Sequence, residues 1–281
     1  MKDINLNLGS YIKELIPFLA TQILGLAVTL KLLALPPEET VAMSEGLSFN
    51  LLDIIILAVI LVLFIFFSKK GGKAGTIFFK VFLTLAVFSG LQLSLGSFLN
   101  PYISLIVSLV LIGLFLYRNN VIIQNIVMVI AIAGIGALFG LTVTPLFAVI
   151  LLAVLSIYDI IAVYKTKHMI SMAKAMIESK AIFGFVIPSK LNLVTERLNN
   201  VTPGDNFMIL GSGDIVMPLI LTSSVAKTSL AGSVIVLIFS LAGLFLTHLI
   251  FTNQNKKRPM AALPPIAALS IIGYLIFYII I

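Results

Sequence analysis

Residues 206–225 read NFMILGSGDIVMPLILTSSV, and residues 145–164 read PLFAVILLAVLSIYDIIAVY. Each run is long and apolar enough to cross a lipid bilayer as a helix. Each also carries one aspartate, Asp214 in the first run and Asp159 in the second. A carboxylate at such depth is costly unless it is paired, protonated or wetted, so two of them indicate a function.

The whole composition is that of a membrane protein. The chain has 281 residues, of which 60% are hydrophobic and 10% are charged, whereas about a quarter of a soluble domain is charged. Apolar runs recur from end to end, which predicts an all-α, polytopic membrane protein. The net charge of +7 is typical of loops that face anionic lipid headgroups, and we expect no nucleic-acid partner.

Nine apolar runs are long enough to be spans. The first follows Lys13 and Glu14 and lacks a small-residue cleavage site, so we expect it to be retained as a span. The chain has no cysteine, which excludes disulfides and thiolate sites. The predicted spans are residues 12–35, 51–67, 76–99, 102–117, 121–140, 145–164, 206–225, 230–252 and 261–281.

The basic residues predict how these spans are oriented. If the N-terminus is cytoplasmic, only Lys31 and Lys227 of the 18 lysines and arginines fall on the outer side. Such a skew follows the positive-inside rule. We therefore expect a cytoplasmic N-terminus, an outer C-terminus and a location in the cell membrane.

The chain divides into three parts within one functional membrane domain. Residues 1–164 carry spans one to six, and residues 206–281 carry spans seven to nine. Residues 165–205 form a long cytoplasmic loop that begins with HMISMAKAMIESK. That segment places methionines on one helical face, which predicts an amphipathic helix at the membrane surface, and the later part of the loop is expected to be irregular or extended.

The two aspartates are predicted to lie at similar depth. Asp159 precedes the cytoplasmic end of span six by five residues, and Asp214 follows the start of span seven by eight. At 1.5 Å per helical residue, these offsets are about 8 Å and about 12 Å. Because the two helices are consecutive and antiparallel, the carboxyls are able to meet, and Gly211 and Gly213 would let the helices pack closely.

A pair of carboxyls in contact suits one kind of chemistry. The two groups share a proton, because both cannot ionise easily side by side. The ionised group can take a proton from water while the protonated group hydrogen-bonds the carbonyl under attack. This pattern favours peptide hydrolysis through a tetrahedral diol.

Three motifs resemble the presenilin and signal peptide peptidase family of intramembrane aspartyl proteases. Tyr158-Asp159 resembles the family's YD motif, and Gly211-Ser212-Gly213-Asp214 resembles its GxGD motif. Ala262-Leu263-Pro264 stands where the family has Pro-Ala-Leu, with Ala261 in place of the first proline. The resemblance extends over nearly the whole chain, including the nine spans and the long loop.

The resemblance implies roles for these residues. Asp159 and Asp214 would be the catalytic dyad, and Ala262, Leu263 and Pro264 would align an unwound substrate by pairing with its backbone. Tyr158 is more often a packing residue than a chemical one at such a position. The predicted orientation is similar to that of presenilins, which implies single-helix substrates with their N-terminus outside.

Other readings of the sequence stay open. Buried acids also serve as proton relays or cation sites, so a proton- or cation-coupled transporter or a cation leak channel is the alternative function. His168 and His248 lack a third clustered ligand, so we expect interfacial histidines, no metal and no cofactor. Compared with presenilin, the loop and the N-terminus are short, which favours a simple prokaryotic relative that works alone, and the oligomeric state stays open between a monomer and a homo-oligomer.

Overall fold

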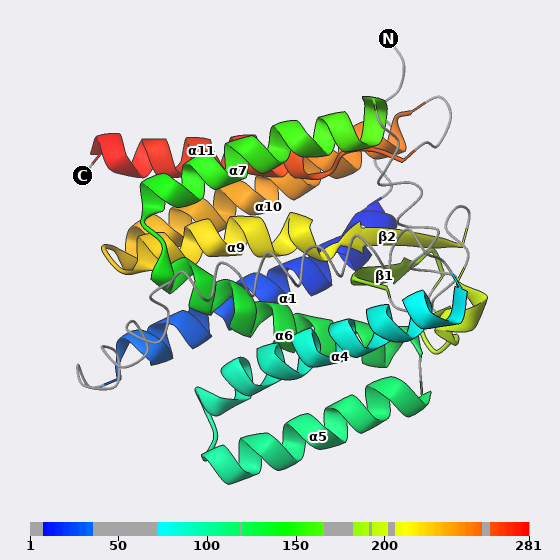
Figure 1. The fold of residues 1–281 in the computed structure, drawn as a ribbon. Coiled ribbons are helices and arrows are strands. Elements are labelled where there is room, and N and C mark those ends of the chain that lie inside the picture. Colours follow the sequence, from blue (N-terminus) through cyan, green and yellow to red (C-terminus); the bar gives the residue numbers. More distant parts are fainter. Residues whose placement is uncertain are drawn as a thin grey trace.

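The computed structural model describes residues 8–35, 72–118, 120–165, 182–190, 193–201, 206–254 and 259–280. Within these ranges the chain forms eight α-helices and a two-stranded sheet (Figure 1). The helices are α1 (Leu8–Leu33), α4 (Gly72–Gly96), α5 (Pro101–Arg118), α6 (Val121–Thr142), α7 (Pro145–Ile160), α9 (Ser212–Ala226), α10 (Leu230–Thr252) and α11 (Leu263–Ile280).

The multi-pass helical prediction is confirmed, whereas the count of nine spans is not. Five helices of the described residues are long and apolar enough to cross a membrane: α1, α5, α6, α7 with its extension to Lys165, and α10. Three further helices carry shorter apolar stretches, which are Lys80–Gly96 within α4, Ser212–Ala226 of α9 and Leu263–Ile279 within α11. The predicted second span, residues 51–67, lies outside the described residues, as does the predicted amphipathic segment after Lys167.

Local capping residues set several helix ends close to their predicted positions. Asn120 begins α6 by accepting a hydrogen bond on its side chain from the Ile123 amide at 3.1 Å. Thr144 caps α7 in the same way, with Pro145 in the first turn. These side chains satisfy amides that a helix start leaves without partners. The predicted break between the fourth and fifth spans is therefore confirmed.

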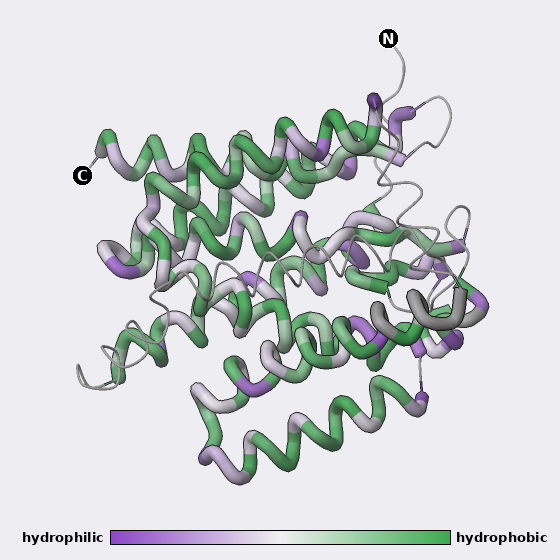
Figure 2. The backbone as a smooth tube through the Cα atoms, in the orientation of Figure 1, coloured by the Kyte–Doolittle hydropathy of each residue, from purple (hydrophilic) through white to green (hydrophobic). Residues whose placement is uncertain are grey.

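The helices form a layered bundle in which α9 is central. Figure 1 shows α7, α10 and α11 on one side and the α4–α5 pair on the other, with α1, α6 and α9 between them. Figure 2 shows that apolar residues run along the helices, while hydrophilic residues gather mainly near their ends. Many apolar side chains on the outer helices are exposed, as expected of surfaces that face lipid.

Small residues bring neighbouring helices close together. A methyl group at Gly140 of α6 would lie 2.3 Å from Cβ of Ser223 on α9. A methyl group at Gly243 of α10 would lie 2.6 Å from Cα of Ile266 on α11. Helices in membranes pack through such small residues because lipid supplies no hydrophobic drive for their association.

The sheet corrects the prediction of an all-helical chain. Strands β1 (Gly184–Pro188) and β2 (Phe207–Gly211) pair antiparallel, with Phe185 opposite Leu210. Residues 207–211 were predicted to be the start of span seven. They form a strand instead because β1, from the long loop, supplies the backbone partners that a helix would otherwise supply. The extended character predicted for the later part of the loop is confirmed at β1.

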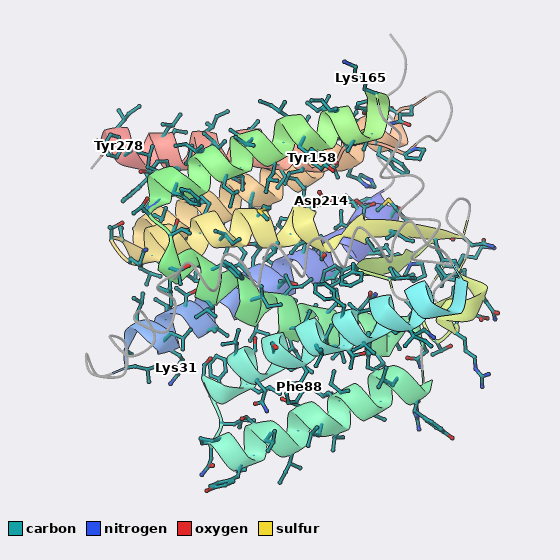
Figure 3. All side chains as sticks on the ribbon, viewed as in Figure 1. Lys31, Phe88, Tyr158, Lys165, Asp214 and Tyr278 are labelled. Atoms are coloured by element: carbon teal, nitrogen blue, oxygen red, sulfur yellow. The ribbon has the colours of Figure 1, made fainter. Side chains whose placement is uncertain are left out.

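Two lysines, Lys31 and Lys165, lie at opposite ends of the helical bundle. Figure 3 shows Lys31 at the end of α1 and Lys165 after α7 at opposite ends of the bundle. Both residues are exposed. This separation agrees with the predicted topology, in which Lys31 is on the outer side and Lys165 on the cytoplasmic side.

Candidate active site

Asp159 lies at the end of α7 and is 8% exposed. Its Oδ2 accepts a hydrogen bond from the backbone amide of Leu263 at 3.3 Å. Directly after Ile160 the helix widens into a π-helical turn over Ile161–Lys165. A backbone donor therefore holds one oxygen of this carboxyl, on a helix that changes its winding just beyond it.

Asp214 lies in the first turn of α9 and is 7% exposed (Figure 3). It is the third residue of the helix, not the ninth of a longer helix as predicted, because β2 occupies the preceding five residues. Its carboxylate lies against Gly211, where a methyl group would stand 3.1 Å from Oδ2. Pro218 lacks an amide hydrogen, so it cannot supply the usual helical bond to the Asp214 carbonyl.

The structure brings the two carboxyls near each other. Helices α7 and α9 are in contact and run antiparallel. The charges of Asp159 and Asp214 are close enough to repel each other. No hydrogen bond joins the two carboxyls in the described part of the chain, and the backbone amide of Leu263 holds one oxygen of Asp159.

The free edge of the sheet leads to Asp214. In an antiparallel ladder, alternate residues direct both backbone groups to the same side. Ser189 and Ser212 make backbone bonds across the hairpin, to Asn206 at 2.9 Å and to Phe183 at 3.3 Å. Even-numbered residues of β2 therefore face β1, and Phe207, Ile209 and Gly211 direct their backbone groups to the opposite edge. That edge ends at the Gly211 backbone beside the Asp214 carboxylate.

The segment before α11 approaches Asp159 from another side. Ala261 and Leu263 are buried at 4% and 5% exposure, and Ala262 and Pro264 are half-buried. Residues 259–262 are not helical, and the amides of residues 260–262 make no hydrogen bond with other described backbone groups. The structure thus brings this motif to Asp159, although an alanine stands at its first position.

The remaining motif residues differ in their surroundings. Gly213 faces open space, because a methyl group there would meet no atom within 4 Å. The close packing expected at Gly213 is therefore absent. Tyr158 is 57% exposed on the surface of α7, whereas its neighbour Asp159 is buried.

Two polar residues that the sequence analysis did not single out support the site. Gln22 of α1 is fully buried, and its Nε2 donates to the Ile215 carbonyl at 3.0 Å, directly after Asp214. Thr247 of α10 places its hydroxyl 3.3 Å from the Ala262 carbonyl. A polar residue within an apolar span is the signal that could have identified Gln22, since such residues are expected to need a partner.

His248 was predicted to be interfacial, and that prediction is wrong. Its side chain is 1% exposed, and Nδ1 lies 2.8 Å from Oε1 of Glu14 on α1. Tyr11 packs against the same imidazole ring with centroids 5.4 Å apart. Because Glu14 supplies a partner, the ring is accommodated inside the bundle and does not need to reach the interface. His168 lies outside the described residues.

The described residues contain no group of three or more His, Cys, Asp or Glu side chains that could hold a metal ion. What the site does contain is two buried carboxyls, a backbone donor and an open strand edge. This arrangement is able to bind an extended peptide and to move protons between water and a peptide bond.

Comparisons with known proteins agree with this arrangement. A family model described as "Signal-peptide peptidase, presenilin aspartyl protease" matches residues 18–281. The chain is similar to a presenilin family intramembrane aspartate protease in its P2 crystal form, with 25% identity, 100% of both chains covered and a TM-score of 0.58. For the C222 form the identity is 24%, the coverage is 93% of this chain and 94% of that chain, and the TM-score is 0.58. Comparison with curated protein sequences found no match.

Proposed function

This chain belongs to the signal-peptide peptidase and presenilin family of aspartyl proteases, and we propose that Asp159 and Asp214 are the two carboxyls with which it cleaves peptide bonds. As a member it is an intramembrane aspartic protease with a multi-pass helical fold. The observation that carries the proposal is the approach of two buried carboxyls on neighbouring helices, close enough for their charges to interact.

The proposed reaction needs one proton shared between the two groups. The ionised carboxyl takes a proton from a water molecule as that water attacks the peptide carbonyl carbon. The protonated carboxyl donates its proton to the carbonyl oxygen, which gives a tetrahedral diol. Transfer of a proton to the amide nitrogen then breaks the C–N bond and releases an amine and a carboxylic acid. The two carboxyls and water suffice, with no covalent enzyme intermediate.

The substrate is proposed to bind as an extended strand. The backbone groups of Phe207 and Ile209 face the free edge of β2, and an added strand would pair with them. Such a strand would run directly to Asp214. The half-buried residues Ala262 and Pro264 lie on the Asp159 side and would align the other part of the substrate.

The substrates are proposed to be single transmembrane helices with their N-terminus outside. The proposal rests on the distribution of basic residues, which favours a cytoplasmic N-terminus and an outer C-terminus for this chain. A helix must unwind locally before its backbone can pair with a strand, because its amides are already engaged within the helix.

Cleavage assays with near-isosteric variants test the dyad. The parent chain, Asp159→Asn, Asp214→Asn and the control Glu196→Gln would be purified in detergent and incubated with a transmembrane-helix peptide. Glu196 is a half-buried acid outside the candidate site, and its Oε2 accepts a hydrogen bond from Asn200 at 3.1 Å. Products would be located by mass spectrometry, so that cleavage within the apolar segment is distinguished from cleavage at its ends.

We expect the parent and Glu196→Gln to cleave within the span and both aspartate variants to be inactive. Efficient cleavage by either aspartate variant would exclude the dyad. If ion flux in proteoliposomes depended on both aspartates while no variant cleaved the peptide, a carrier function would replace the proposed one.

A further inference from the structure

Strand β1 has partners on both of its edges. One edge pairs with β2, and the other faces two neighbouring amide side chains of α6, Gln124 and Asn125. Gln124 is 1% exposed, and its Nε2 donates to the carbonyls of Ile182 at 2.8 Å and Gly184 at 3.2 Å. The outer edge of β1 is therefore closed by side chains of a membrane helix.

Asn125 binds β1 as a neighbouring strand would. Its Nδ2 donates to the Val186 carbonyl at 2.7 Å, and its Oδ1 accepts from the Val186 amide at 2.9 Å. A strand residue in an antiparallel ladder exchanges the same two bonds with its opposite residue. The side-chain amide thus replaces a third strand at this position.

Because the outer edge of β1 is closed, a further strand can add to this sheet only at the edge of β2. An unpaired strand edge is a template for any other strand, and a two-stranded hairpin alone is only marginally stable. With β1 closed, the edge of β2 that passes Ile209 and ends beside Asp214 is the open edge of this sheet in the described residues. A strand that adds there is delivered to the dyad.

We propose that Gln124 and Asn125 are positioning residues that keep the β1–β2 hairpin assembled before a substrate arrives and confine strand addition to β2. This inference rests on the proposed function of the site, because it concerns how that site receives a peptide. The two amides touch neither carboxyl, and they act on the reaction through the four hydrogen bonds to residues 182–186.

The inference predicts separate effects on KM and kcat. If the hairpin is assembled in only a fraction of the molecules, a substrate must select that fraction, and its apparent affinity falls in proportion. Saturating substrate restores the hairpin. Loss of the amides should therefore raise KM while kcat changes little. Damage to the fold in general would instead lower the amount of active enzyme and reduce kcat at an unchanged KM.

Hydrogen exchange and kinetics on the full-length protein test the proposal. Gln124→Met, Asn125→Leu and the double variant remove the amides at similar volume. Gln92→Met is the matched control, since Gln92 joins α4 to α5 through Ser104 at 3.1 Å, in a different part of the bundle. Exchange of residues 182–190 and 206–211 would be followed by mass spectrometry, with and without a transmembrane-helix peptide.

We expect the double variant to exchange hairpin amides at least about tenfold faster without peptide, as the loss of several hydrogen bonds requires, and to regain protection with peptide. KM should rise by a similar factor, and the control should match the parent. Unchanged hairpin protection, or a loss of kcat at constant KM, would overturn the proposal. If the parent failed to cleave any peptide, the proposed function would fail, while the exchange experiment would still decide whether the amides hold the hairpin.

Discussion

The backbone amide of Leu263 donates a hydrogen bond to Oδ2 of Asp159 across 3.3 Å, which joins the first residue of α11 to the end of α7. The donor belongs to the Ala262-Leu263-Pro264 motif at the start of α11, and the acceptor is one of the two buried carboxyls. A peptide amide keeps its donor whatever side chain the residue carries. This bond can therefore be removed only by changing the backbone itself.

Replacement of Leu263 by proline removes that donor. Leu263 is the first residue of α11, where proline is tolerated because the amide has no helical partner. A hydrogen bond to a charged group contributes about 1.5–3 kcal/mol, so we expect Leu263→Pro to lower kcat by roughly tenfold to a hundredfold. Leu263→Ala keeps the amide but loses buried apolar contacts, and it should mainly lower the thermal unfolding midpoint. Equal kcat values for the two variants would show that the amide does not act on Asp159.

Glu14 and His248 offer a test of a buried polar pair. Their side chains are 2.8 Å apart and 4% and 1% exposed. Removal of one partner leaves the other buried without its hydrogen bond, which costs about 1–3 kcal/mol. We expect Glu14→Ala and His248→Ala each to lower the unfolding midpoint strongly, and the double variant to lower it by much less than the sum. Strictly additive effects in this double-mutant cycle would show that the pair does not stabilise the fold.

The two glycines of the motif should respond differently to alanine. A methyl group at Gly211 would lie 3.1 Å from Oδ2 of Asp214, whereas one at Gly213 would meet nothing within 4 Å. We expect Gly211→Ala to reduce kcat by displacing the carboxylate. Gly213→Ala should leave the unfolding midpoint unchanged or slightly higher, since alanine favours a helix by about 0.5–1 kcal/mol over glycine.

The open space at Gly213 also leads to a prediction about substrate binding. If a substrate backbone occupies that space beside Asp214, Gly213→Ala should raise KM without loss of stability. Steady-state kinetics and thermal unfolding on the same preparations separate the two effects. A variant with parental KM would show that substrates do not use this space.

The predicted orientation can be checked with single cysteines, because the chain has none of its own. Lys31 and Lys165 are both exposed and lie at opposite ends of the bundle (Figure 3). In intact cells, Lys31→Cys should react with a membrane-impermeant thiol reagent, and Lys165→Cys should react only after permeabilisation. The reverse pattern would invert the topology and, with it, the expected orientation of substrates.

Much of the helical fold could be predicted from residues alone. The predicted span 230–252 matches α10 (Leu230–Thr252), and Asn120 marks the start of α6 as the break after Arg118 suggested. Such ends are local properties, because apolar length and a capping side chain act within a few residues. The segment 206–211 could not be assigned in this way. A short apolar run suits a buried strand as well as a helix, and its partner β1 comes from a distant part of the loop.

The residues of the candidate site also divide into those that local sequence could predict and those that it could not. Asp159 and Asp214 were identified because a carboxylate in an apolar run is conspicuous at any position. The supporting residues Gln22, Thr247 and Asn125 were not identified, since their roles depend on hydrogen-bond partners on other elements.

By itself, the sequence determined that this chain crosses a membrane several times and that two acids must be accommodated within it, because transfer from water into lipid is a cost that each residue carries individually. The tertiary structure alone decided which polar groups meet. Glu14 and His248 are 234 positions apart, and Asn125 reaches Val186 across 61. Such pairs depend on how helices are packed against one another, and no local pattern records that geometry.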